Sequence, residues 1–290
     1  GMFSHIKVIA MARWFVATRG RAMALTNLGY PAGEMTLPLL FIPLLALIGW
    51  RMSWGVVVAL LLFVVLPLLV WLLREDRAPQ GQAATTGGAG IDGRHWQRPE
   101  VLHHWAFWAL IPFLLTPGFI GTVVFFHQVH VSEVKGWTLA AMAPGYIAYA
   151  AASVSTSFVA GWASDRFTPP ALLPIAVLPM ALGAVLIGTA VDPVGWFAAL
   201  ALTGISTGIS ATLGGTLLPY LYGTDHLGAI RAIATAVMVF STAIGPGITG
   251  LVIDWGIAFP DQGVAMALWC VTLSAAMALV AARLRRMALA

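Results

Sequence analysis

Glu34 stands alone as a charged residue within a long apolar stretch of the sequence, residues 22–48. If that stretch is a helix beginning near Ala22, a rise of about 1.5 Å per residue places the Glu34 carboxyl about 18 Å along it, close to the middle of a membrane. An ionisable group at that depth is costly and points to a function. Glu34 is therefore a candidate for proton coupling or for a substrate contact. The alternatives are a protonated carboxyl that hydrogen-bonds between helices and a carboxyl paired with another segment.

A stripe of hydroxyl groups is the second candidate. Tyr146, Tyr149, Ser153 and Ser157 follow one another at spacings of three and four residues, so on a helix they share one face. We expect that face to line a cavity. Because the apolar stretches hold few Lys or Arg residues, the stripe and Glu34 favour a neutral, cationic or proton-coupled substrate over a multiply charged anion. Hydrogen bonding between helices is the equally open alternative for these hydroxyls.

Metal and nucleotide chemistry find little support in the sequence. His103 and His104 precede an apolar stretch and His127 and His130 follow it, so the four rings should lie at opposite ends of one helix and cannot share a metal ion. The second pair alone could bind a metal or sense pH, but interfacial histidines are usually structural. The sequence also lacks the Gly-x-x-x-x-Gly-Lys-Ser/Thr, His-Glu-x-x-His and Gly-x-Ser-x-Gly motifs. We expect no metal site, no cofactor and no use of ATP.

Membrane-spanning helices must position these residues. The chain is 60% hydrophobic and 9% charged, whereas soluble domains have roughly 45–50% and about 25%, so a soluble globular protein is excluded. Apolar stretches of about 20 residues can cross a membrane as helices and are too long for the alternating strands of an outer-membrane barrel. The sequence predicts an all-α, polytopic membrane protein with about eight spans, at residues 22–48, 54–73, 105–127, 138–161, 169–191, 194–218, 232–253 and 264–282.

Basic residues gather in alternate connections between the predicted spans. The segments 1–21, 74–104, 162–168, 219–231 and 283–290 hold 13 of the 15 Lys and Arg residues. Because cytoplasmic connections carry such an excess, we expect these segments and both termini to be cytoplasmic, in a bacterial inner membrane. The net charge of +4 then reflects a lipid partner rather than a nucleic acid.

The longest connection divides the chain into two unequal parts. From Gln80 to Gly93 it is rich in Gly, Ala, Thr and Gln, a composition that cannot bury enough apolar area to fold and that predicts a flexible linker. We expect residues 1–74 to form a first part with two complete spans, residues 75–104 to form the linker, and residues 105–290 to form a second part with six spans.

The segment Gly161-Trp162-Ala163-Ser164-Asp165-Arg166 resembles the Gly-x-x-x-Asp-Arg signature of the major facilitator superfamily, in the copy that belongs to the C-terminal half. The match is partial, because Thr168-Pro169-Pro170 follow where the family pattern has a Gly and a basic pair. Further stretches that resemble the family are Arg13-Trp14-Phe15, Arg19-Gly20-Arg21-Ala22, Gly49-Trp50-Arg51 and Tyr222-Gly223.

The resemblance implies a transporter of two six-helix halves joined by a long cytoplasmic loop. The six spans after the linker then correspond to a C-terminal half, and about the first three and a half helices of the family fold would be absent. The resemblance also implies a gate formed by Gly161, Asp165 and Arg166. Asp165 would lie near the N-terminus of the helix that begins around Ala229, with Arg231 as a partner, and would stabilise one access state.

The sequence thus predicts a secondary active transporter, a symporter or antiporter, rather than an enzyme. It would move a small-molecule substrate by alternating access with protons as the coupling ion, and would be monomeric when full length. Two alternatives stay open. One is a polytopic membrane enzyme acting on lipid, which would need several acids or histidines at one depth. The other is an inactive transporter fragment.

Overall fold

The computed structural model describes residues 11, 15, 18–72, 74 and 89–289. Every regular element in these residues is helical, which confirms the all-α prediction. The elements are α2 (Arg19–Asn27), α3 (Gly29–Leu60), a π-helical turn (Leu61–Val65), α4 (Leu66–Leu72), α5 (Arg98–His103), α6 (Trp105–Phe126), α7 (Gln128–Lys135), α8 (Leu139–Met142), α9 (Pro144–Phe167), a 3-10 turn (Pro169–Leu172), α10 (Leu178–Thr189), α11 (Pro193–Tyr222), α12 (Leu227–Asp254) and α13 (Phe259–Leu289).

Five helical segments of the described residues are long and apolar enough to cross a membrane: Leu47–Leu72, Trp105–Phe126, Pro193–Tyr222, Leu227–Asp254 and Phe259–Met287. They correspond to five of the eight predicted spans. The chain is therefore an integral membrane protein.

Two of the other predicted spans take a different form. The span predicted over 138–161 becomes α8 and α9, and α9 is long enough, at 24 residues, but is rich in Ser, Gly and Tyr. The span predicted over 169–191 has only 12 residues of α-helix, because α10 does not begin until Leu178. Pro169, Pro170 and Pro174 cause this late start, since proline lacks the N–H that a helix interior needs.

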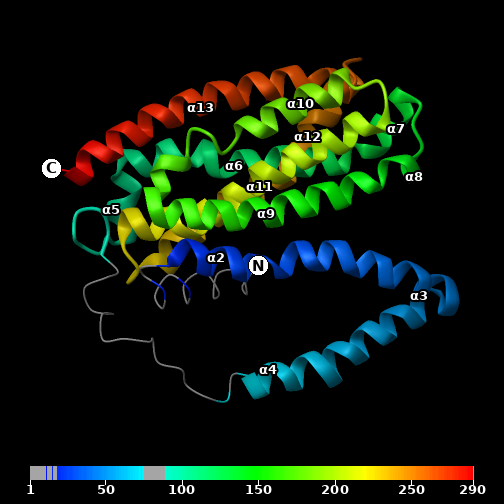
Figure 1. Ribbon diagram of the computed structural model, residues 1–290, viewed down its shortest axis with the longest axis horizontal. Helices are drawn as coiled ribbons and strands as arrows, with labels where there is room; N and C mark the ends of the chain where they lie inside the picture. The colour runs from blue at the N-terminus through cyan, green and yellow to red at the C-terminus, as the bar shows by residue number, and fades with distance from the viewer. Residues whose placement is uncertain (1–10, 12–14, 16–17, 73, 75–88, 290) are drawn as a thin grey trace.

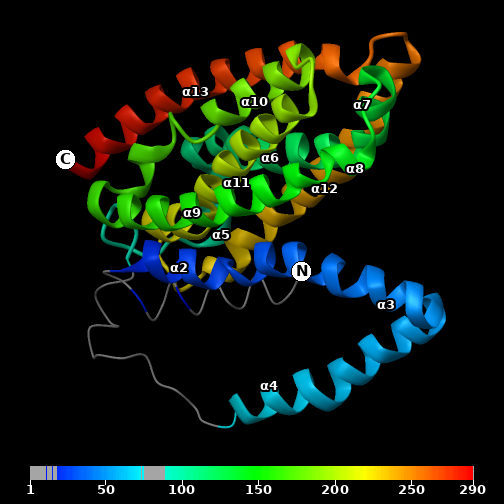
Figure 2. The same ribbon diagram turned by 45° about the vertical axis from the view of Figure 1, so that its right-hand side comes forward.

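The long helices α6, α9, α10, α11, α12 and α13 run side by side in one bundle (Figures 1 and 2). Within it α9 packs along α11, α10 along α13 and α6 along α12. Helix α2 lies against α9 and α11. In Figure 1 α5 and the C-terminus lie at one end of the bundle, and α7 and α8 lie at the other.

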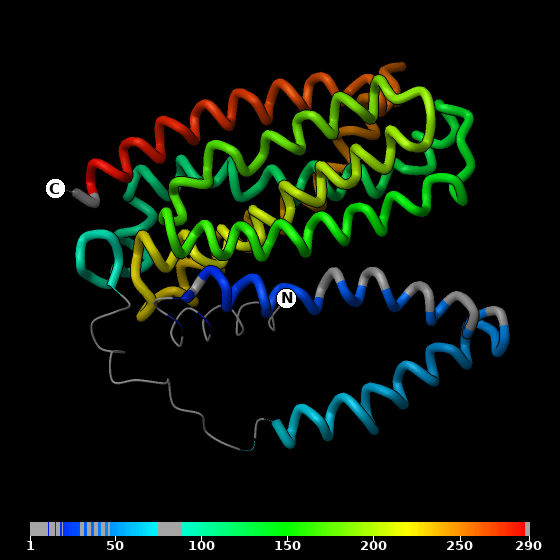
Figure 3. The backbone as a smooth tube through the Cα atoms, in the orientation of Figure 1, coloured from blue at the N-terminus to red at the C-terminus, as the bar shows by residue number. Residues whose placement is uncertain are grey.

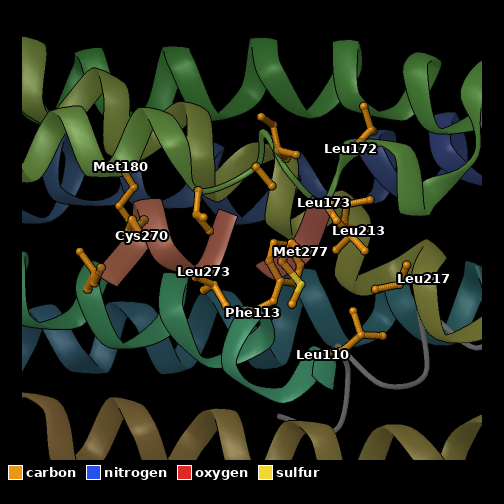
Figure 4. Packing of buried hydrophobic residues seen from close by; sticks show 14 of the residues in the cluster. Leu110, Phe113, Leu172, Leu173, Met180, Leu213, Leu217, Cys270, Leu273 and Met277 are labelled. Carbon is orange, nitrogen blue, oxygen red and sulfur yellow. The ribbon is translucent and has the colours of Figure 1, made fainter. Parts of the chain in front are cut away.

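Buried apolar side chains from four helices and one turn fill the centre of the bundle (Figure 4). Phe113 of α6, Leu213 of α11 and Met277 of α13 are at most 1% exposed there. Cys270 of α13 is also buried and carries a free thiol. In a membrane, packing of this kind replaces the hydrophobic effect as the force that holds helices together.

Glycines set the closest helix crossings. A Cβ atom added to Gly208 of α11 would lie 2.4 Å from the carbonyl oxygen of Ser153, and one added to Gly204 would lie 2.4 Å from that of Tyr149. Only glycine permits this approach of α11 to α9. The contact between α2 and α9 is equally close, because a Cβ atom on Gly20 would meet the Gly161 carbonyl oxygen at 2.2 Å.

A helical hairpin leads away from the bundle. Figure 3 shows the chain turning back within α3 and returning through α4. Gly49 interrupts α3 with φ 75° and ψ 165°, a conformation that L side chains rarely adopt. It lies in the predicted connection between the first two spans. The most apolar stretch of segment Leu47–Leu72 is not buried against any described part of the protein.

The end of the predicted linker is fixed to the bundle. The backbone N–H of Ile91 donates to the Leu221 carbonyl at 3.2 Å, and that of Trp96 donates to the Tyr222 carbonyl at 3.0 Å. The Trp96 ring is buried against these residues at the end of α11. The last residues of the stretch predicted to be flexible, 89–93, are therefore held against the bundle, and residues 75–88 lie outside the described part.

Candidate functional site

A cavity of about 790 Å³ lies between α6, α9, α11 and α12. Helix α6 supplies a mainly apolar wall that includes Phe113, Pro117 and Phe125. The walls from α9 and α11 carry hydroxyl groups, and Asn27 at the end of α2 reaches the same space. The volume falls within the range of about 300–1,000 Å³ that is typical of small-molecule sites.

Three of the four residues in the predicted hydroxyl stripe line this cavity: Tyr149, Ser153 and Ser157. Tyr146 is not part of its lining. The Tyr146 hydroxyl donates to Gln128 of α7, and its ring stacks on Phe125 with centroids 5.6 Å apart. Tyr146 lies one turn nearer the start of α9, where the short α7 and α8 cover the end of the bundle (Figure 1).

Hydroxyls of α9 also bond between helices. Ser157 Oγ donates to the Gly208 carbonyl at 3.2 Å, and Thr212 Oγ1 donates to the Ser157 carbonyl at 3.3 Å. Ser157 therefore both lines the cavity and joins α9 to α11. Both expectations for the stripe, that it lines a cavity and that it bonds between helices, therefore apply to Ser157. A role in substrate binding stays a prediction.

Glu34 lies in the first leg of α3, one residue beyond Gly33. Its side chain lies outside the part of the chain that the structure describes. That Glu34 couples protons or contacts substrate therefore remains a prediction from the sequence.

Asp165 caps α2. Its Oδ1 accepts from the Gly20 N–H at 2.6 Å and its Oδ2 accepts from the Arg21 N–H at 3.1 Å, with Arg21 Nε 4.0 Å away. The Asp165 side chain is 14% exposed. The first N–H groups of a helix lack partners within the helix and carry partial positive charge, which a carboxylate stabilises. Asp165 thereby fixes the start of α2 to the end of α9.

The predicted partners of Asp165 were wrong. The sequence interpretation assigned it to the helix beginning around Ala229 and to Arg231, but it binds α2 instead. The cause is the close crossing of Gly20 and Gly161, which brings the free N–H groups of α2 within reach of Asp165. Of the other predicted gate residues, Gly161 forms this crossing and Arg166 is exposed, with its guanidinium 5.9 Å from the Phe167 ring.

Arg231 faces the cavity. Its Nη1 donates to the Gly214 carbonyl of α11 at 2.6 Å. Arg231 lies in the second turn of α12 and bonds to α11, whereas Asp165 lies in the last turn of α9 and bonds to α2.

The histidines lie at the two ends of α6, as their positions in the sequence predict. His104 Nδ1 is 3.1 Å from the Tyr222 hydroxyl, and His127 Nε2 is 2.8 Å from Thr249 Oγ1. Burial lowers the pKa of His127 below its ordinary value. Among the described residues no group of three or more His, Cys, Asp or Glu side chains could hold a metal ion.

Sequence reasoning missed the wall of the cavity that α11 provides. Thr207, Ser210 and Gly214 line it at spacings of three and four residues. The same periodicity that selected the stripe on α9 was available here. A run of small and hydroxyl residues on α11 concealed it, because Thr203, Ser206 and Thr212 form further polar faces on the same helix.

Helices of spanning length packed around an internal, partly polar cavity define an integral membrane protein of the transporter type. The family model described as "Major Facilitator Superfamily" matches residues 1–154, more than half of the chain. The chain belongs to that superfamily. Comparison with curated proteins found no match.

Proposed function

We propose that this chain carries a small solute across the membrane by alternating access, driven by a proton gradient. The observation that carries the proposal is the cavity of about 790 Å³ between α6, α9, α11 and α12, in a chain of the major facilitator superfamily. Its combination of aromatic and hydroxyl walls suits a small organic molecule better than a bare ion. Tyr149 and Ser153 are the residues of the predicted stripe best placed to contact that molecule.

The contact between Asp165 and α2 supports a gate. It joins residues that are 144 and 145 positions apart in the sequence, through hydrogen bonds to the first N–H groups of α2. Opening the bundle at this end would break these bonds and expose the carboxylate. The contact would therefore stabilise the state in which α2 and α9 are together, while the cavity itself binds the solute.

The orientation and the membrane are part of the same proposal. Figure 1 places α5, the start of α2 and the C-terminus at one end of the bundle. These segments belong to the set rich in Lys and Arg, so we assign that end to the cytoplasm of a bacterial inner membrane. Residues 105–290 would then act as the six-helix half and residues 1–74 as the remainder of its partner half.

Glu34→Gln tests the proton coupling. Reconstituted vesicles that contain a pH-sensitive dye report proton movement when candidate solutes are added outside. We expect solute-dependent proton movement with the wild-type chain and none with Glu34→Gln, because the amide keeps the shape but cannot titrate. Solute exchange without net proton movement should survive in the variant.

Glu133→Gln is the matched control, because Glu133 is an exposed acid on α7 outside the cavity. It should transport like the wild type. Accumulation of solute by Glu34→Gln with the wild-type pH dependence would show that Glu34 is a structural residue. The absence of any solute-dependent signal with the wild-type chain would contradict the transport proposal itself.

A further inference from the structure

The cavity contains a cationic group for which the proposed transport cycle has no use. Among the cavity-lining residues that the structure describes, Arg231 is the one with a formal charge. Its Nη1 is bound to the Gly214 carbonyl, but its Nε is buried and has no hydrogen-bond partner within the described residues. A buried guanidinium donor without an acceptor is costly, so this group is prepared for an acceptor from outside the protein.

A second unpaired donor lies on the same wall. Ser210 Oγ is buried, lines the cavity and has no hydrogen-bond partner in the described part of the chain. Ser210 precedes Gly214 by one turn of α11, and Gly214 is the residue that holds Arg231. Two unsatisfied donors, one of them cationic, therefore belong to residues that line the same cavity beside the stretch of α11 from Ser210 to Gly214. An oxygen acceptor with negative charge would satisfy both.

The remaining walls limit what such an anion can be. Phe113, Leu114, Pro117 and Phe125 of α6 face the cavity, and Met238 of α12 adds to this apolar surface. An inorganic anion would leave this surface uncovered. With a single cation in the described lining, a second negative charge on the ligand would have no partner.

We infer that the cavity binds an organic monoanion, whose carboxylate or sulfonate accepts hydrogen bonds from Arg231 and Ser210 while its apolar body packs against α6. This inference rests on the proposed function, because it names the substrate class of the same cavity. The sequence assigned Arg231 to the gate and favoured a neutral, cationic or proton-coupled substrate over a multiply charged anion, and the inference adds a singly charged anion to these classes. A monoanion moved together with one proton would cross without net charge.

Binding of 1-naphthoate to the purified chain in lipid nanodiscs tests the inference, with 1-naphthamide as the neutral molecule of the same shape. Equilibrium dialysis against excess unlabelled ligand separates saturable binding from partition into lipid. We expect naphthoate to bind at least about tenfold more tightly than naphthamide. Arg231→Gln should abolish that preference and Arg231→Lys should keep part of it. Ser210→Ala should weaken naphthoate binding about two- to tenfold.

Arg51→Gln is the control, because Arg51 is exposed beside Trp50 and far in sequence from the cavity helices. It should keep the full preference. Equal binding of naphthoate and naphthamide by the wild type, or an unchanged preference in Arg231→Gln, would leave Arg231 as a clamp on α11 and overturn the inference. If Arg231→Gln does not fold, two measurements test the inference instead: the preference of the wild type for naphthoate, and the loss of naphthoate affinity in Ser210→Ala. The absence of both would overturn it.

The two proposals fail separately. If the chain prefers naphthoate but moves no solute in vesicles, the anion site is supported and the transport proposal is contradicted. If the chain transports a solute but binds naphthoate and naphthamide equally, the transport proposal is supported and the anion site is contradicted.

Discussion

Several charged side chains in this protein form hydrogen bonds with backbone groups of another helix. Asp165 accepts from the N–H groups of Gly20 and Arg21, Arg231 donates to the carbonyl of Gly214, and Lys135 Nζ donates to the carbonyl of Ala190 at 3.0 Å. Within a membrane such bonds satisfy polar groups that lipid cannot. Asp165 and Lys135 also place their charges at helix ends, at the start of α2 and the end of α10, where the peptide dipoles stabilise them.

Asp165→Asn should change turnover more than substrate affinity. Asparagine keeps an oxygen that can accept from an N–H of α2, but it removes the charge, which is worth about 0.3–1 kcal/mol at a helix terminus. The state in which α2 and α9 are joined should therefore lose about two- to fivefold in relative population. Initial uptake rates across a range of solute concentrations measure both quantities.

Asp192→Asn is the matched control, because Asp192 also caps a helix: its Oδ1 accepts from the Gly195 N–H at 3.1 Å at the start of α11. That cap lies at the opposite end of the bundle from Asp165 and should not alter turnover. A pure loss of affinity in Asp165→Asn would place Asp165 in the binding site and contradict its role in the gate.

Among the elements, α9 and α11 form the central pair on which the site depends. Their contact combines the glycines Gly204 and Gly208 with hydrogen bonds of Ser157 and Thr212. The cavity opens along the same pair, so a change in the distance between these helices alters the position of the hydroxyls that line it.

Gly208→Ala should lower the midpoint of thermal unfolding of the detergent-solubilised chain by several degrees. The added Cβ atom would lie 2.4 Å from the Ser153 carbonyl oxygen, and such overpacking costs about 1–3 kcal/mol. Gly247→Ala on α12 is the control, because a Cβ atom there has nothing within 4 Å. It should leave the midpoint unchanged or raise it slightly, since alanine favours the helix. Equal midpoints for the two variants would show that α9 and α11 can move apart without a loss of stability.

Periodicity and hydropathy predicted the elements well where a helix is uniformly apolar, as in α6, α12 and α13. They failed where proline interrupts the helix, because hydropathy does not register the missing N–H groups of Pro169, Pro170 and Pro174. For the site, the spacing of Tyr149, Ser153 and Ser157 identified a face that lines the cavity. The contacts of Asp165 and Arg231 could not be predicted in the same way, because they depend on how closely Gly20 approaches Gly161 and on which carbonyl of α11 lies within reach of the Arg231 guanidinium.

At the scale of the whole molecule, a compact bundle is joined to a hairpin whose second leg, through α4, lies apart from it (Figures 1 and 2). The bundle holds the cavity and the buried core, while the most apolar stretch of Leu47–Leu72 is exposed in the described part of the chain. Helix α2 connects the two. Asp165 and the glycine crossing create its contact with α9, and Met23 packs on Gly215 in its contact with α11.

The proposed topology predicts which ends of the bundle a reagent can reach from outside the cell. In a Cys270→Ser background, Glu133→Cys on α7 should react with a membrane-impermeant maleimide in intact cells. Phe167→Cys at the end of α9 should react only after the membrane is permeabilised. Both positions are exposed. Labelling of Phe167→Cys alone in intact cells would invert the topology.

The way in which Asp165 holds α2 also constrains how freely the sequence can vary at neighbouring positions. Asp165 recognises backbone N–H groups, which every amino acid except proline possesses, so position 21 should accept many side chains. Position 20 has no such freedom, because any Cβ atom there would collide with the carbonyl oxygen of Gly161. Two adjacent residues that bind the same carboxylate should therefore differ sharply in mutational tolerance, with a wide range of substitutions allowed at Arg21 and none at Gly20.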